Sequence, residues 1–296
     1  MACAITAVVL CIDAAWLLSG GWSVSGRGVA VLALAVAACL APLSIGRYRR
    51  DPRIAATTPF CALLLVFQAA AATLSYLVIS TNAGLVDAPL AAWDRTLGFD
   101  WLALHGWLRD HAIVQALLRI AYVSGLPQMV FVVVFLGLTG RRRRLEEFML
   151  LLIGATLATI AISGIFPAAG AWKFHATAAS FDVSSLSHFE LLREGHLREI
   201  ALDRMQGLIS IPSLHAAMAV LLIHAVRGST VVGPVIVALD LAMLASTPID
   251  GGHYLVDVLA GIALAGLLIA CSRKHAARAW SASRIAPAAN LGAIQP

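Results

Sequence analysis

Long apolar runs dominate this sequence and constrain its fold more than any other feature. A helix needs about 20 mostly apolar residues to cross the hydrocarbon core of a bilayer. The chain is therefore predicted to be an all-α, polytopic membrane helix bundle, with an N-terminal helical pair and a six-helix core. About eight membrane-spanning helices are predicted, at residues 4–20, 28–46, 58–80, 113–139, 147–167, 211–227, 231–248 and 254–272.

The charge content supports a membrane protein and argues against a nucleic-acid-binding protein. Charged residues make up 12% of the chain, whereas soluble domains normally carry about a quarter. The net charge of +5 comes largely from basic residues clustered in short loops between the apolar runs. Such clusters mark the cytoplasmic loops of membrane proteins. We therefore expect membrane lipids, and no nucleic acid, among the partners of this protein.

Three basic stretches, at 47–53, 141–144 and 272–278, predict the orientation of the bundle. With eight alternating spans, all three fall on the same side as both termini, and the positive-inside rule makes that side the cytoplasm. The chain is thus expected to be a multi-pass protein of a bacterial inner membrane. No Lys or Arg precedes the first apolar run, so that run is predicted to be a retained helix and not a cleaved signal peptide.

Composition shifts divide the chain into three predicted regions. They are an N-terminal helical hairpin at 1–57, a membrane domain at 58–275 and a disordered cytoplasmic tail at 276–296.

Two long polar connections, 81–112 and 168–210, are predicted on the side opposite to the basic loops. The first contains Trp93, Trp101 and Trp107, which indicate amphipathic segments in the membrane interface. In the same connection Asp94 and Arg95 are predicted either to shape the outer surface or touch a headgroup, or to cap a helix.

Five cysteines lie in or beside the apolar runs, at Cys3, Cys11, Cys39, Cys61 and Cys271. No CxxC spacing occurs, and none of the five falls in a long polar connection where a disulfide would be useful. We interpret them as small core residues.

The stretch STPIDGGHYLVDVLAG, residues 246–261, places ionisable side chains at the mouth of the last apolar run. Such residues are costly in a bilayer and usually face a protein interior, a cavity or water. Because Gly251 and Gly252 interrupt the chain, His253 is expected at the outer N-terminal end of a helix, with Asp257 on the same face. The carboxylate can hold one imidazole nitrogen protonated and leave the other free as a nucleophile or base. The alternative is a polar pair that fixes helix packing.

A second stretch, GLISIPSLHAAMAV at 207–220, has a similar design. Pro212 and Ser213 precede His215, and proline and serine are favoured where helices begin. A helix start offers unpaired backbone N–H groups and a positive dipole end, which together form an anion site. Because both histidines are predicted on the same membrane face, the two helix starts fit phosphoryl transfer better than packing.

These residues also resemble a known family, the type 2 phosphatidic acid phosphatase superfamily. PSLH at 212–215 is similar to the PSGH motif of that family, and STPIDGGHYLVD at 246–257 is similar to its SRxxxxxHxxxD motif with identical spacing. PSLH together with GHYxxDVxAG is more similar to the branch that contains inositol phosphorylceramide synthases than to the soluble acid phosphatases. The resemblance covers about 58–272 and implies a phosphatase-like six-helix core.

The resemblance implies a role for each matching residue. His253 would attack phosphorus and form a phosphohistidine, with Asp257 orienting the imidazole. His215 would protonate the leaving alkoxide and then activate the water or alcohol that resolves the intermediate. Ser213, the backbone around Leu214, and Gly252 would hold phosphate oxygens. No metal and no cofactor is required.

The sequence departs from the family pattern at two places. Thr247 stands where the family has an arginine, and SGIFPAAGAWKFHA at 163–176 occupies the place of the KxxxxxxRP motif. Because a phosphoryl group needs positive charge around its oxygens, we expect Lys173, Arg193 or Arg204 to supply it. Arg204 is the preferred candidate, since it lies eight residues before the PSLH motif.

The sequence therefore predicts an integral membrane lipid phosphatase or phosphotransferase. Its substrate would be a lipid phosphate or a polyprenyl diphosphate at the extracytoplasmic face, and its intermediate a phosphohistidine. A close alternative is a transferase that passes an inositol-phosphate headgroup to a lipid alcohol. Two further alternatives are a transporter, with Asp13, Arg119 and Asp240 marking a pathway, and a metal-dependent hydrolase that uses the two histidines and Asp257 as ligands.

Overall fold

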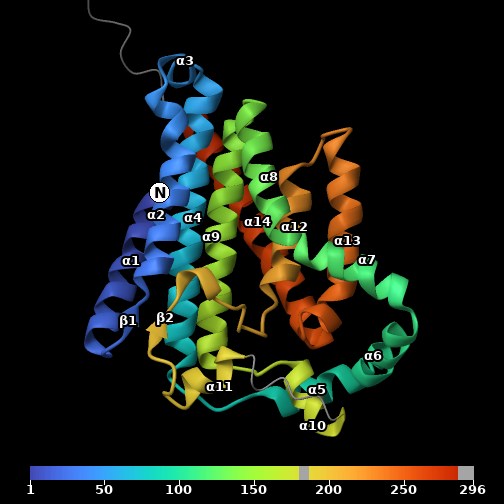
Figure 1. The fold of residues 1–296 in the computed structure, drawn as a ribbon. Coiled ribbons are helices and arrows are strands. Elements are labelled where there is room, and N and C mark those ends of the chain that lie inside the picture. The colour runs from blue at the N-terminus through green and yellow to red at the C-terminus, as the bar shows by residue number, and fades with distance from the viewer. Residues whose placement is uncertain (180–186, 286–296) are drawn as a thin grey trace, which may run out of the picture.

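The computed structural model describes residues 1–179 and 187–285, and these residues form an almost entirely helical bundle (Figure 1). This confirms the predicted all-α, polytopic architecture. The helices are α1 Ala2–Ser19, α2 Gly26–Leu40, α3 Gly46–Arg49, α4 Pro52–Ile79, α5 Asp87–Thr96, α6 Trp101–Asp110, α7 Ala112–Val123, α8 Gly125–Leu138, α9 Arg142–Ile165, α10 Ala171–Ala179, α11 His188–Arg193, α12 Leu214–Ala225, α13 Val232–Asp250 and α14 Leu255–Ile285. Two 3-10 helices, η1 Ala41–Ser44 and η3 Leu202–Arg204, and two short strands, β1 Ser23–Val24 and β2 Glu199–Ile200, complete the described elements.

The number of membrane-spanning helices differs from the predicted eight. Among the described residues, six helical segments are long and apolar enough to cross a membrane: α1, α2 with η1, α4, α9, α13 and the Leu255–Lys274 part of α14. Helices α7 and α8 together could form a seventh span, but they bend by 45° at their junction. Helix α12 has 12 residues and is therefore only about 18 Å long. The expected spans at 113–139 and 211–227 are thus a bent pair and a short helix.

Basic residues of the sequence fall in and beside α3, at the α8–α9 connection and at the α12–α13 connection. These three parts of the chain lie at one end of the bundle (Figure 1). Glu147 of α9 accepts a hydrogen bond from Arg227 at 2.8 Å and pairs with His224 of α12 at 3.0 Å. Arg144 donates to the backbone carbonyl of Arg227. These contacts fasten α9 to α12 at the basic end. The short helices α5, α10 and α11 lie at the opposite end.

Helices α12 and α14 pack closely enough to bring their first turns together. The largest apolar cluster surrounds α12, with fully buried side chains such as Leu136, Met149 and Leu221. On α14, a Cβ atom at Gly261 would lie 2.2 Å from the backbone carbonyl oxygen of Ser213. Only glycine permits that approach, so Gly261 sets the distance between the two helix starts.

The N-terminal helices α1 and α2 both pack against α4. Between them, β1 pairs in parallel with β2, with Ser23 opposite Glu199 and Val24 opposite Ile200. The sequence does not predict this pairing, because strands of two residues are too short to show an alternation of apolar and polar side chains. The boundary proposed at 57/58 falls inside α4. The tail proposed at 276–296 begins inside α14, and its part beyond Ile285 lies outside the described residues.

Two expectations about burial are wrong for some of their residues. All five cysteines are free; Cys39 and Cys61 are partly buried, but Cys3, Cys11 and Cys271 are exposed, so these three are not core residues. Helices α5 and α6 form as predicted, but Trp101 of α6 is buried, and its indole N–H donates to the backbone carbonyl of Pro248 at 2.8 Å. Trp101 therefore anchors α6 to α13 instead of lying in the membrane interface.

Candidate active site

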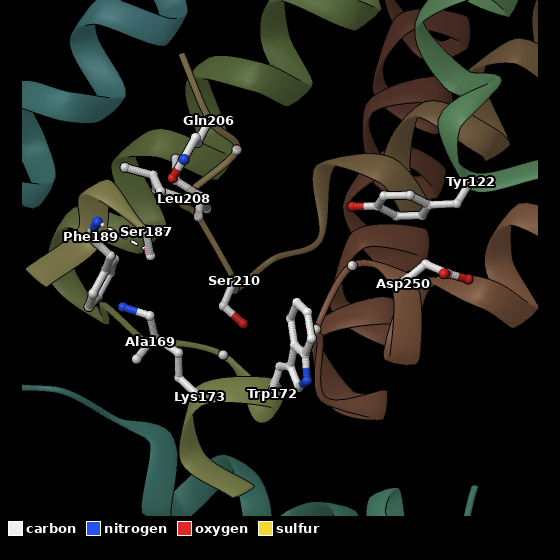
Figure 2. Close-up of a pocket in the computed structure, with 15 residues that line it drawn as sticks. Tyr122, Ala169, Trp172, Lys173, Ser187, Phe189, Gln206, Leu208, Ser210 and Asp250 are labelled. Atoms are coloured by element: carbon white, nitrogen blue, oxygen red, sulfur yellow. Dashed lines mark hydrogen bonds between the residues drawn. The ribbon is translucent and has the colours of Figure 1, made fainter. Parts of the chain in front are cut away.

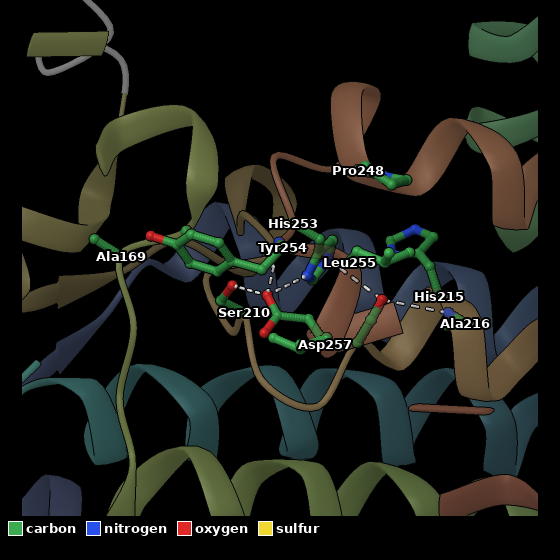
Figure 3. A network of polar contacts seen from close by, with 12 residues as sticks. Ala169, Ser210, His215, Ala216, Pro248, His253, Tyr254, Leu255 and Asp257 are labelled. Carbon is green, nitrogen blue, oxygen red and sulfur yellow. Dashed lines mark hydrogen bonds and ion pairs between the residues drawn. The ribbon is translucent and has the colours of Figure 1, made fainter. Parts of the chain in front are cut away.

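His253 lies two residues before α14, immediately after the turn that ends α13. Gly252 takes a φ of +64°, a left-handed conformation that favours glycine. The imidazole of His253 is buried, with its Nδ1 atom 3.4 Å from Oδ2 of Asp257 (Figure 3). Its Nε2 atom lies 3.4 Å from the hydroxyl oxygen of Ser213. Asp257 can therefore hold the proton on Nδ1 while the Nε2 lone pair stays available.

Asp257 is fully buried, and donors from two segments hold its carboxylate (Figure 3). Besides facing His253, the Oδ2 atom accepts hydrogen bonds from the Ser210 hydroxyl and from the backbone N–H of Tyr254, the latter at 3.1 Å. The backbone carbonyl of Asp257 accepts from the N–H of Ser213 at 3.0 Å. These bonds fix the carboxylate and tie the first turn of α14 to the PSLH segment.

Ser213 caps α12 as predicted. Its hydroxyl oxygen accepts a hydrogen bond from the N–H of Ala216 at 3.3 Å. Leu214 and His215 form the start of the helix. The imidazole of His215 stacks on Tyr122 of α7, with ring centroids 4.3 Å apart, and its Nδ1 lies 3.4 Å from the Tyr122 hydroxyl. The two histidines therefore stand at neighbouring helix starts, each fixed by an oxygen-bearing side chain.

A cavity of about 360 Å³ adjoins these residues (Figure 2). Ser210, Gly252 and Tyr122 contribute to its wall, and Trp172 and Lys173 of α10 form the other side. The two histidines do not themselves line the cavity. Tyr122, on which His215 stacks, and Gly252, which directly precedes His253, do line it, so the cavity adjoins the histidine pair through these residues.

The three candidate cations lie in different surroundings. Lys173 faces the cavity, with its Nζ atom 3.3 Å from Oε1 of Glu190 and 4.8 Å from the ring centre of Phe189. Arg193 lies over the same ring at 5.5 Å but does not line this cavity. Arg204, the preferred candidate, lines a separate cavity of about 300 Å³ beside α2. The structure thus brings only Lys173 of these three to the cavity beside the histidines.

Thr247, at the position where the family motif has an arginine, makes its hydrogen bond within its own helix. Its side chain is fully buried, and its hydroxyl donates to the backbone carbonyl of Met243 at 2.6 Å. The neighbouring Ser246 hydroxyl donates to the same carbonyl at 2.8 Å. The position therefore helps to hold α13 and presents no group to the cavity.

Two carboxylates of α5 contact the start of α14, directly after His253. Asp94 accepts hydrogen bonds from the N–H groups of Leu255 and Val256, so it caps α14, a distant helix. Asp87 accepts from the hydroxyl of Tyr254 at 2.9 Å. Sequence reasoning missed Asp87, although its seven-residue spacing from Asp94 places both on one face of a helix.

Burial changes the pKa of two groups where α5 meets the start of α14. It raises the pKa of Asp94 above the ordinary value, and the N–H donors of Leu255 and Val256 act in the opposite direction. Burial, together with the charge of Asp87, also raises the pKa of the Tyr254 phenol. The phenol therefore stays protonated and remains a hydrogen-bond donor to Asp87.

The described residues give little support to the other two classes of protein. Asp13 and Asp240 are buried, but their helices α1 and α13 lie at opposite sides of the bundle (Figure 1), and Arg119 is exposed. These charges do not form one pathway. Within 1–179 and 187–285, no three His, Cys, Asp or Glu side chains are grouped as a metal site would require.

Comparison with protein families gives one match. A family model described as the PAP2 superfamily matches residues 88–271, which is more than half of the chain. The match includes both histidines, Asp257 and Lys173, and it leaves out α1 to α4. No curated protein and no solved structure matches the chain.

The position of Lys173 predicts how the cavity responds to a phosphate anion. Lys173→Ala should weaken the binding of inorganic phosphate about tenfold, since one charged partner is lost. The measurement is the rise in unfolding temperature of the purified protein as phosphate is added. Arg204→Ala is the matched control and should leave this rise unchanged. A larger effect of Arg204→Ala would contradict the assignment.

Proposed function

The chain belongs to the PAP2 superfamily, and on that premise we propose that it is a membrane lipid phosphatase or phosphotransferase with His253 as its nucleophile. The observation that carries the proposal is the row of contacts from Asp257 through His253 to Ser213, beside a second histidine at the next helix start. A nucleophile, a group that orients it and a separate acid are the parts that covalent phosphoryl transfer requires.

In the first step, Nε2 of His253 attacks phosphorus while the Nδ1 proton stays hydrogen-bonded to Asp257. The bond between phosphorus and the lipid oxygen breaks, and its electron pair leaves with that oxygen. His215, in its protonated form, gives a proton to the departing oxygen. From a lipid monophosphate the products are a lipid alcohol and a phosphohistidine at His253, whereas from a polyprenyl diphosphate the leaving group would be a polyprenyl phosphate.

In the second step, neutral His215 takes a proton from water or from an alcohol, whose oxygen then attacks phosphorus. The phosphorus–nitrogen bond breaks, and its electron pair returns to Nε2 of His253. Water as the acceptor releases phosphate, whereas an alcohol acceptor receives the phosphoryl group. The mechanism needs no metal ion, because the nucleophile and the acid are both histidines.

The charge that develops on the phosphoryl oxygens requires donors that are already in place. We assign this part to the Ser213 hydroxyl, the backbone at Leu214 and Gly252, and the Lys173 ammonium group. The start of α12 adds the positive end of a helix dipole. Lys173 takes the part of the missing arginine, since it lines the cavity beside the histidines. Arg193 and Arg204 are assigned no contact with the phosphoryl group.

The distribution of basic residues supports an extracytoplasmic active site. Arg144, in the first turn of α9, bonds to Arg227, just after α12. The α8–α9 and α12–α13 connections beside them lie at the end of the bundle far from α5 and α10 (Figure 1). The positive-inside rule makes that end cytoplasmic. We propose that the substrate, a lipid phosphate or a polyprenyl diphosphate, reaches the histidines from the outer leaflet of a bacterial inner membrane. Both termini would then be cytoplasmic.

Headgroup transfer is the second candidate function. The wall of the cavity also includes Ser210, Trp172, Gln206 and Ser187 (Figure 2), so it combines hydroxyl, amide and aromatic side chains beside the place for phosphate. Such a wall fits a polar headgroup that stays attached to the phosphoryl unit. This agrees with the resemblance of PSLH and GHYxxDVxAG to inositol phosphorylceramide synthases.

His253→Ala should abolish phosphate release from lipid phosphates, by at least about a thousandfold, because the covalent route is lost. The assay uses purified protein with phosphatidic acid, a polyprenyl diphosphate or a phosphoinositide, each with and without an added alcohol. His196→Ala is the control, since His196 is an exposed histidine of the outer connection. Full activity of the His253→Ala protein would exclude the mechanism. Activity should persist in EDTA.

His215→Ala should slow the enzyme according to the leaving group. With an alkyl phosphate the loss should be about 100-fold to 10,000-fold, the usual contribution of a general acid. With a nitrophenyl phosphate ester, whose leaving group needs no proton, formation of the intermediate should slow less than about tenfold. Burst-phase kinetics separate the formation of the phosphohistidine from its breakdown by water or alcohol. Equal losses in the first step for both esters would contradict the role of His215 as the acid.

A further inference from the structure

Helix α14 begins without a capping residue of its own. The first N–H groups of a helix have no partner within it, and a Ser, Thr, Asp or Asn directly before the helix usually accepts from them. Tyr254 occupies that position here, and its hydroxyl is bonded elsewhere. The N–H groups of Leu255 and Val256 instead donate to Asp94, at 2.8 Å and 3.0 Å. The cap is thus supplied from α5, 161 residues earlier in the chain.

The capped turn is the one that aligns the proposed nucleophile. His253 stands directly before Tyr254, and Asp257 is the third residue of α14. The Asp257 carboxylate reaches back to the N–H of Tyr254 at 3.1 Å, which is the second half of a capping box. If the first turn moved, the carboxylate would lose its position against Nδ1 of His253.

Asp87 joins the same segment to the cavity wall. Its Oδ1 atom accepts from the Tyr254 hydroxyl at 2.9 Å and from the N–H of Gly170 at 3.0 Å, and its Oδ2 accepts from the N–H of Ala169 at 2.9 Å. Gly170 directly precedes α10, the helix that carries Lys173. One carboxylate therefore holds the segment after the nucleophile and the start of the wall that bears the cation.

Both carboxylates are more than nine-tenths buried, at 6% exposure for Asp87 and 4% for Asp94. Burying a charged group is costly unless donors compensate for it. Elsewhere the chain caps helices locally, as Asp51 does for α4 and Asp100 for α6. Local capping would satisfy α14 equally well, so helix stability alone does not account for two buried carboxylates from a separate helix.

We propose that Asp87 and Asp94 are positioning residues, through which α5 aligns His253 and Asp257 with the wall that carries Lys173. Neither carboxylate touches the substrate. The inference rests on the proposed function of His253. If His253 is the nucleophile, its alignment by α5 affects the reaction rate; if it is not, α5 has no effect on catalysis through this residue. A displacement of about 1 Å in such an alignment can cost about 100-fold in rate.

The substitutions separate positioning from general stability. Asp94→Ala removes the acceptor of two backbone N–H groups, whereas Asp94→Asn keeps the shape and one acceptor. Asp51 provides a matched control, because its carboxylate also accepts two backbone N–H groups, from Arg53 at 2.8 Å and Ile54 at 3.4 Å. It lies at the start of α4, at the opposite end of the bundle (Figure 1).

The experiment measures kcat and KM of full-length variants on phosphatidic acid, or on whichever lipid phosphate the native protein hydrolyses. Hydrogen exchange of the peptide spanning residues 250–262 is followed by mass spectrometry. Asp94→Ala should lower kcat about 10-fold to 100-fold, change KM less than about threefold and speed exchange in this peptide. Asp94→Asn should be intermediate, and Asp87→Asn should also lower kcat. Asp51→Ala should leave kcat and this exchange unchanged, even if its unfolding temperature falls.

An unchanged kcat in Asp94→Ala would overturn the proposal, as would an equal fall in kcat for Asp51→Ala. If Asp94→Ala does not fold, Asp94→Asn and Asp87→Asn carry the same test, and native kcat in both would overturn it. Failure of the proposed function is a separate result, because it appears as full activity in His253→Ala.

Discussion

The rest of the site depends on the hydrogen bonds made by the buried carboxylate of Asp257. One oxygen, Oδ2, faces His253 and accepts from Ser210 and from the backbone of Tyr254. A carboxylate buried at the end of a membrane bundle must be partnered, and these partners come from two segments that are distant in sequence. The need to satisfy one charge therefore brings the PSLH segment and the start of α14 together, and Gly261 allows them to approach.

The long helices of the bundle and the layer of short helices α5, α10 and α11 have different roles. Helices α9, α12 and α14 contribute to the largest apolar core, and contacts between α9 and the end of α12 fix the basic end. The proposed chemistry lies at the other end, where the short helices α5, α10 and α11 are found (Figure 1) and where α5 packs against α14. Catalysis in the proposed mechanism thus depends on an outer layer whose own helices are too short to be stable alone.

Local spacing made part of this arrangement predictable. The Ser213 cap and the contact of His253 with Asp257 follow from residues three or four positions apart, which local geometry brings together. The choice between Lys173 and Arg204 depends on how the long connection at 168–210 folds, and no periodicity encodes that path. Hydropathy also could not show that α7 and α8 bend at Ser124, since the apolar run continues across the break.

The central claim is a covalent phosphohistidine at His253, and trapping it is the most direct test. His215→Ala protein, in which resolution should be slow, is mixed briefly with a nitrophenyl phosphate ester and quenched in alkali, which preserves phosphohistidine. Peptide mapping by mass spectrometry should then find one phosphoryl group on His253, within the peptide 246–261. A phosphoryl group on any other residue, or turnover with no covalent adduct in quenched samples, would contradict the account.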